Sequence, residues 1–132
     1  MSSDITSADW GKLILRVSIG GMMLCHGIHK VLNGVDGVVG IVEGRGLPGF
    51  IAYGAYLGEV VAPVALIIGY YTRPAAVVLA FTMLMAIFLA HPGDILKLTE
   101  HGAWGIETPA LFLFGGAAIA LLGSGRVALG KS

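Results

Sequence analysis

Charged residues and cysteines are both scarce in this sequence. Of its 132 residues, 8 are Lys or Arg and 8 are Asp or Glu, so the formal net charge is zero and 12% of the chain is charged. A soluble domain is about 25% charged, and a nucleic-acid-binding domain carries a basic excess. Both classes are therefore disfavoured. The single cysteine, Cys25, excludes an intrachain disulfide and CxxC thiol chemistry.

Apolar sequence is what the chain has in abundance. Hydrophobic residues make up 56% of it, and the mean hydropathy is +0.87. These values indicate an integral membrane protein in contact with the lipid bilayer. The first nine residues are polar and include Asp4 and Asp9. Because no small-residue cleavage site follows a short apolar core, we expect the first apolar segment to be a retained span and not a signal peptide.

Four segments are candidates for membrane helices, which need roughly 20 apolar residues to cross about 30 Å of hydrocarbon. They cover residues 10–31, 50–71, 74–91 and 108–123. Pro74 and Pro109 each fall in the first turn of a predicted helix, where proline is tolerated. The sequence therefore predicts one all-α domain over residues 1–132, an integral membrane four-helix bundle. The glycine-rich segment 35–47 predicts a short interfacial amphipathic helix, with a flexible loop as the alternative.

The distribution of Lys and Arg predicts the orientation. One side of the predicted bundle holds the N-terminus, the turn at residues 71–74 and the C-terminus. The basic residues on this side are Lys12, Arg73, Arg126 and Lys131. The loops on the other side mix Lys30, Arg45 and Lys97 with four acidic residues. By the positive-inside rule, both termini are expected in the cytoplasm.

Glu59 is the most informative single residue, since it lies in the middle of the second apolar segment. A carboxylate at that depth costs on the order of 3 kcal/mol, so it usually has a partner or a function. Four residues later comes Pro63, which has no N–H to donate to the Glu59 carbonyl. The segment is expected to place a carboxylate and a backbone carbonyl without a helical hydrogen bond at the same depth in the membrane.

Other ionisable residues gather in the outer half of the predicted bundle, near Glu59. They are His26, His29, Lys30, His91 and Glu107. We expect Glu59 to pair with Arg16 from below, or with His26 or Lys30 from above. Such a pair either fixes helix register or handles protons at a ligand site. His26 and His29 share a helix face, which leaves a metal or haem as a weak alternative.

Several short motifs, taken in order, resemble the DoxX family of small bacterial and archaeal membrane proteins. The match covers about residues 11–129, and its motifs are Arg16, Gly20, His26-Gly27-Ile28-His29-Lys30, Gly46-Leu47-Pro48, Glu59, Gly69-Tyr70-Tyr71-Thr72-Arg73-Pro74, Glu107-Thr108-Pro109 and Gly123-Ser124-Gly125-Arg126. The resemblance implies a multi-pass four-helix bundle in a prokaryotic cytoplasmic (inner) membrane. It also implies that Arg16, Gly27, Lys30, Glu59, Gly69, Arg73 and Glu107 occupy the family's characteristic positions. The family often ends in a Ser-Leu-Asp-like tail, and this chain departs from it with Val127-Ala128-Leu129-Gly130.

The family's name comes from a terminal quinol oxidase and a thiosulfate:quinone oxidoreductase, and other members are linked to membrane redox complexes that respond to oxidative or thiol stress. The first functional hypothesis is therefore a membrane subunit of a quinone-linked redox system. Glu59, His26, Lys30 and Glu107 would form its ligand pocket, and electrons would come from a protein partner. The alternatives are a non-catalytic membrane scaffold or partner-docking subunit and, with less support, a small transporter or channel. A protein partner or a homo-oligomer is expected.

Overall fold

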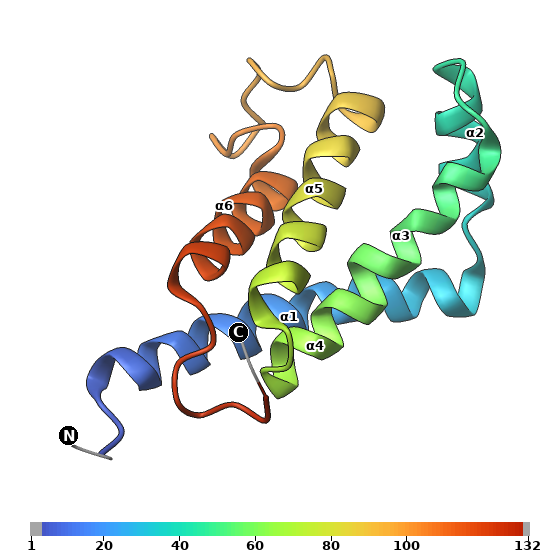
Figure 1. The fold of residues 1–132 in the computed structure, drawn as a ribbon. Coiled ribbons are helices and arrows are strands. Elements are labelled where there is room, and N and C mark those ends of the chain that lie inside the picture. The colour runs from blue at the N-terminus through green and yellow to red at the C-terminus, as the bar shows by residue number, and fades with distance from the viewer. Residues whose placement is uncertain (1–3, 131–132) are drawn as a thin grey trace.

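Every regular element in the computed structural model, which describes residues 4–130, is helical (Figure 1). This confirms the all-α class. The α-helices are α1 (Ser7–Asn33), α2 (Asp36–Gly44), α3 (Gly54–Tyr56), α4 (Ala62–Ile68), α5 (Thr72–Ala90) and α6 (Glu107–Leu122). A 3₁₀ helix, η1 (Gly49–Tyr53), and a π-helical turn, η2 (Leu57–Val61), complete the set.

Two continuous helical stretches are long and apolar enough to cross a membrane. They are Gly49–Ile68, with 20 residues and a mean hydropathy of 1.8, and Thr72–Ala90, with 19 residues and a mean hydropathy of 2.0. The helix α6 is apolar but shorter, with 16 residues. With 27 residues, α1 is long enough, but it carries Lys12, Arg16 and Lys30. The other two predicted spans remain predictions.

The turn between the second and third predicted spans covers residues 69–71, earlier in the chain than the residues 72–73 that the sequence suggested. The second helix ends at Ile68 and not at Tyr71, because Gly69 adopts a left-handed conformation with φ 74°. The backbone N–H groups of Gly69 and Tyr70 both donate to the Ala65 carbonyl, which closes the helix end in the way that glycine caps favour. Helix α5 then starts at Thr72, with Pro74 in its first turn.

The main core lies where α1 packs across α4, α5 and α6. Its buried residues include Met23, Leu66, Leu79 and Ile119, one from each of these helices. Small residues permit the close packing: a Cβ added at Gly20 would lie 2.9 Å from the Pro63 carbonyl oxygen. In Figure 1, α5 and α6 stand side by side while α1 crosses beneath them at a steep angle.

A second, smaller core holds the segment that precedes η1. Residues 36–44 form the helix α2, which buries Val42 against Ala52 of η1. Leu89 of α5 packs against the same cluster. The glycine-rich segment is therefore helical, and whether α2 lies at the membrane interface remains a prediction.

Arg16 is the most deeply buried charged residue of the fold. Its side chain is 1% exposed, and its guanidinium donates to backbone carbonyls from two other parts of the chain. Nε binds the Leu66 carbonyl at 2.9 Å, and Nη1 binds the carbonyls of Ser124 and Val127 at 2.6 and 2.8 Å. Arg16 therefore joins α1 to the end of α4 and to residues 123–130, which we call the tail.

The tail also completes the end of α4. The N–H groups of Leu129 and Gly130 donate to the carbonyls of Ile68 and Gly69, at 2.9 and 3.1 Å. The last carbonyls of a helix have no partner within the helix, and inside a membrane protein they need one. Arg16 and the tail together supply these partners.

Asp9 fixes the tail to the start of α1. One carboxylate oxygen accepts the backbone N–H of Thr6 at 3.0 Å, within a capping box. The other oxygen accepts the backbone N–H of Arg126 at 3.2 Å. These bonds, above all the Thr6 N–H, lower the pKa of the Asp9 carboxyl below its usual value.

Arg16→Met should destabilise the bundle and release the tail. The substitution leaves several buried carbonyls without donors, each at about 1–3 kcal/mol, so we expect a loss of about 3 kcal/mol. Thermal unfolding in detergent measures it, and faster tryptic cleavage after Arg126 reports the tail. Arg45→Met is the matched control, because Arg45 is exposed and Nε makes one bond, to the Leu89 carbonyl. Equal effects of the two substitutions would contradict the role of Arg16.

The Asp9 contacts should be lost in acid. Because the pKa of Asp9 is lowered in the folded state, its contribution is present above the unfolded pKa of about 3.9 and disappears as the pH falls through the folded pKa. Asp9→Asn should therefore lower the melting temperature at pH 7, and its difference from wild type should shrink at low pH. A difference that is constant with pH would contradict this assignment. Asp36→Asn, on α2, provides the baseline.

Candidate functional site

Glu59 lies on the π-helical turn η2, in the middle of the second helical stretch. The Ala62 N–H donates to the Leu57 carbonyl, five residues back, which is the π-helical pattern. Pro63 follows immediately, and it has no N–H to offer to the Glu59 carbonyl. Single π turns inside α-helices occur frequently at functional sites. The Glu59 residue is 5% exposed, so its carboxylate needs a partner inside the protein.

That partner is Lys30, in the last turn of α1. Lys30 Nζ lies 2.6 Å from Glu59 Oε1 in a charge-assisted hydrogen bond. The Lys30 side chain is 25% exposed, so the ammonium is less deeply buried than the carboxylate. Of the three cations considered from sequence, Lys30 makes the pair, and Arg16 is bound to carbonyls elsewhere.

Gly27 allows α1 to approach η2 closely enough for this pair to form. A Cβ added at Gly27 would overlap the carbonyl oxygen of Glu59. One turn further along α1, the Tyr56 hydroxyl donates to the Lys30 carbonyl at 3.3 Å. The backbone contact and this hydrogen bond fix the relative position of the two charged residues.

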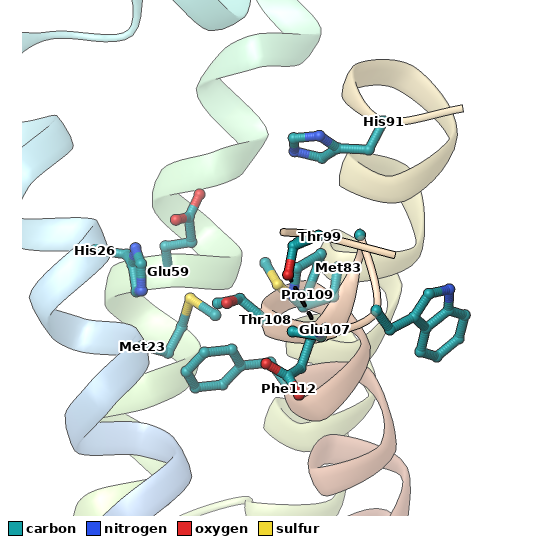
Figure 2. A pocket seen from close by; sticks show the side chains of 13 residues that line it. Met23, His26, Glu59, Met83, His91, Thr99, Glu107, Thr108, Pro109 and Phe112 are labelled. Carbon is teal, nitrogen blue, oxygen red and sulfur yellow. Dashed lines mark hydrogen bonds between the residues drawn. The ribbon is translucent and has the colours of Figure 1, made fainter. Parts of the chain in front are cut away.

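Two clefts meet at Glu59. The first, which we call the polar cleft, has a volume of about 410 Å³ and lies between α1, α5, α6 and the loop of residues 91–106. Figure 2 shows Glu59 and His26 on one side of it, Glu107 and Thr108 of α6 on another, and His91 at its upper end.

The second, which we call the apolar cleft, has a volume of about 610 Å³. It lies between α2, η1, η2 and α5, and aliphatic and aromatic side chains form most of its lining. Lys30 and Glu59 provide the charged groups in this lining. Both clefts have the size of ordinary small-molecule sites.

The structure distributes the predicted site residues between the polar cleft and the apolar cleft. Glu59 and Lys30 line the apolar cleft, whereas Glu59, His26 and Glu107 line the polar cleft. The His26 ring packs edge-on against Phe112, with centroids 5.9 Å apart, and both His26 and Glu107 are exposed. Arg16 lines neither cleft.

His29 lies apart from these residues. Its ring Nδ1 is 3.2 Å from the side-chain nitrogen of Asn33, one turn further along α1. Within residues 4–130 the structure brings together no group of three or more His, Cys, Asp or Glu side chains suited to a metal. The metal alternative at His26 and His29 gains no support from this arrangement.

His91 is a site residue that the sequence analysis counted in the outer cluster but did not include in the pocket. It ends α5, lines both clefts, and its Nδ1 lies 3.5 Å from Asp94. Its position at the outer end of a predicted span was the available signal. What the sequence could not show is that α5 stands between the two clefts.

Two glycine-rich segments match phosphate-binding motifs in sequence but not in the structure of their described residues. Residues 44–49 read GxGxxG and residues 125–132 read GxxxxGKS. Both patterns require a strand before the glycines and a helix after them. Residues 44–49 instead follow α2, and the tail follows α6 without regular structure as far as residue 130; the last two residues of the second pattern lie outside the described residues. As far as the structure describes them, up to residue 130, neither segment has the strand–glycine–helix arrangement of a nucleotide site.

Comparison with known proteins gives two matches. The model of the DoxX family matches residues 11–92. A Bacillus subtilis (strain 168) protein named "Putative oxidoreductase CatD" is 32% identical over 123 residues, which covers 93% of this chain and 87% of that protein. No solved structure matches.

Gly27→Ala should weaken the site, because its methyl group would force α1 away from the Glu59 carbonyl. We expect a lower melting temperature and a weakened Lys30–Glu59 interaction, measured as a reduced coupling energy in a double-mutant cycle of Lys30→Met and Glu59→Gln. Gly21→Ala is the matched control on the same helix, since a Cβ there meets nothing within 4 Å. It should be neutral or slightly stabilising. A neutral Gly27→Ala would contradict the close approach.

Proposed function

Because the chain belongs to the DoxX family, we propose that it is a membrane subunit of a redox system and that it binds a quinone-like ligand beside the Lys30–Glu59 pair. Membership of a membrane-protein family supports association with the bilayer. The word "oxidoreductase" in the name of the Bacillus subtilis relative supports the redox assignment. The electrons are proposed to come from a partner protein.

The proposed topology is a bundle of four spans: α1, Gly49–Ile68, α5 and α6. Two of them are long and apolar enough to cross a membrane by themselves. Both termini are proposed to face the cytoplasm of a prokaryotic cell. The bond from the Arg126 N–H to Asp9 supports a common side, since it ties the tail to the first turns of α1.

The observation that carries the ligand proposal is the place of the ion pair in the apolar cleft. A quinone combines an apolar ring and chain with carbonyl oxygens. The apolar cleft offers the matching surfaces: a mostly apolar lining, together with the Lys30 ammonium and the Glu59 carboxylate. Lys30 has three N–H donors, so it can keep its bond to Glu59 and donate another to a ligand carbonyl.

The π turn adds support to a ligand function. A regular α-helix over residues 54–68 would be the simpler structure for this apolar stretch, and η2 interrupts it at Glu59. Burying an ion pair rarely adds net stability compared with apolar residues of the same size. A costly charge pair on an irregular helical turn, with clefts on two sides, fits a binding site better than a packing device.

Lys30→Met should weaken quinone binding at least about tenfold, because a hydrogen bond from a charged donor contributes about 1.5–3 kcal/mol and about 1.4 kcal/mol corresponds to tenfold in Kd. Glu59→Gln should weaken it as well, because it removes the carboxylate that holds the Lys30 ammonium in place. The protein is purified in mild detergent, its extract is analysed for bound quinone by mass spectrometry, and short-chain benzoquinones and naphthoquinones are titrated by calorimetry. Glu100→Gln and Lys97→Met are matched controls, because both residues are exposed and line neither cleft.

The same samples decide between this function and a non-catalytic scaffold. For a ligand site, Glu59→Gln lowers the affinity and leaves the melting temperature near that of wild type. For a scaffold, no quinone binds, Glu59→Gln lowers the melting temperature, and the double substitution with Lys30→Met restores it. The second result would overturn the proposal.

A further inference from the structure

The polar and apolar clefts have almost separate linings. Among the residues that the structure describes, Glu59 and His91 line both clefts, and both are titratable. Glu59 contributes a buried carboxylate at the wall between the clefts, and His91 lies at the end of α5, where the outer loop begins. Two groups that can hold a proton thus stand where the clefts adjoin.

The clefts lead to different surroundings. The exposed apolar residues Leu57, Val77 and Phe81 line the apolar cleft on η2 and α5, and such surfaces of a membrane protein face lipid. The lining of the polar cleft includes the exposed residues Thr99, Glu107 and Thr108, from the loop of residues 91–106 and the start of α6. An apolar ligand therefore reaches Glu59 through one cleft, and water reaches it through the other.

We infer that the polar cleft is a water-side entrance to Glu59, through which protons pass to and from a ligand held in the apolar cleft. Glu59 takes a proton from water in the polar cleft. It gives this proton to a ligand oxygen that has become basic by gaining electrons from the partner protein of the proposed function, and its carboxylate then pairs again with Lys30. Glu59 itself transfers only the proton, and the partner protein supplies the electrons. This inference rests on the proposed function for the identity of the ligand, but the two-sided access to Glu59 stands without it.

Two carbodiimides of opposite solubility test the access. Each activates a carboxyl group as an O-acylisourea, which ends as a stable acylurea or, with Lys30 Nζ only 2.6 Å away, as a Glu59–Lys30 amide with loss of the urea. Peptide mass spectrometry locates and counts both products as reaction at Glu59. Dicyclohexylcarbodiimide partitions into lipid and should reach Glu59 through the apolar cleft. The water-soluble ethyl-dimethylaminopropyl-carbodiimide should reach it through the polar cleft. Wild-type protein in liposomes is expected to react at Glu59 with both reagents.

Two alanines make a matched pair for blocking one cleft at a time. Ala103 lines only the polar cleft and Ala86 lines only the apolar cleft. Ala103→Phe should slow the water-soluble reagent at Glu59 several-fold and leave the lipid-soluble reagent unaffected. Ala86→Phe should do the reverse. Reaction of the exposed Glu100 with the water-soluble reagent should stay constant in every variant and serves as the internal standard.

If either variant has a melting temperature well below that of wild type, Thr108→Tyr replaces Ala103→Phe and Ala90→Phe replaces Ala86→Phe, since these residues line the same clefts. The inference is overturned if the water-soluble reagent does not modify wild-type Glu59, or if blocking the polar cleft leaves its rate unchanged.

Quinone binding, measured on the same proteins, separates this inference from the proposed function. Loss of quinone binding in Ala86→Phe but not in Ala103→Phe supports both. Loss in Ala103→Phe alone would place the ligand in the polar cleft and overturn the inference. If wild type binds no quinone but shows the expected labelling, the water-side entrance is supported and the quinone assignment fails.

Discussion

The fold depends on the requirement that a charge inside a membrane protein be satisfied by the protein itself. Arg16 meets this requirement with backbone carbonyls alone: two from the end of α4 and two from the tail. The C-terminal end of a helix carries a partial negative charge, which suits a cation. Because the contacts come from two distant parts of the sequence, the position of α1 across the bundle and the course of the tail are both set by this one side chain.

The charges of Lys30 and Glu59 are satisfied in a different way from that of Arg16. Lys30 and Glu59 bond to each other at 2.6 Å, but both line a cleft, and the Lys30 side chain is partly exposed. Arg16 is enclosed and donates to backbone carbonyls, whereas the Lys30–Glu59 pair borders a cleft. Arg16 serves the architecture, and in the proposed function the Lys30–Glu59 pair serves the ligand.

The sequence was informative about the elements that apolar composition and local signals determine. The apolar stretches and their proline and glycine boundaries predicted an all-helical chain, and the depth of Glu59 marked it as the residue that needs a partner. The sequence did not determine which cation pairs with Glu59, since Arg16, His26 and Lys30 were all within reach along α1. That choice depends on the crossing of α1 over η2, which Gly27 permits and which no local pattern encodes. The position of the tail could not be predicted from the sequence either, because its contacts with Arg16 join residues more than 100 positions apart.

The order in which the chain is synthesised gives the tail a further significance. In the proposed topology, Arg16 enters the membrane with α1 before its acceptors at Ser124 and Val127 have been translated. Until then the guanidinium must rely on lipid headgroups, water or the insertion machinery. The final packing of α1 against α4 therefore has to follow the release of residues 124–127 from the ribosome, so α1 cannot reach its final position until α6 and the tail have both been synthesised.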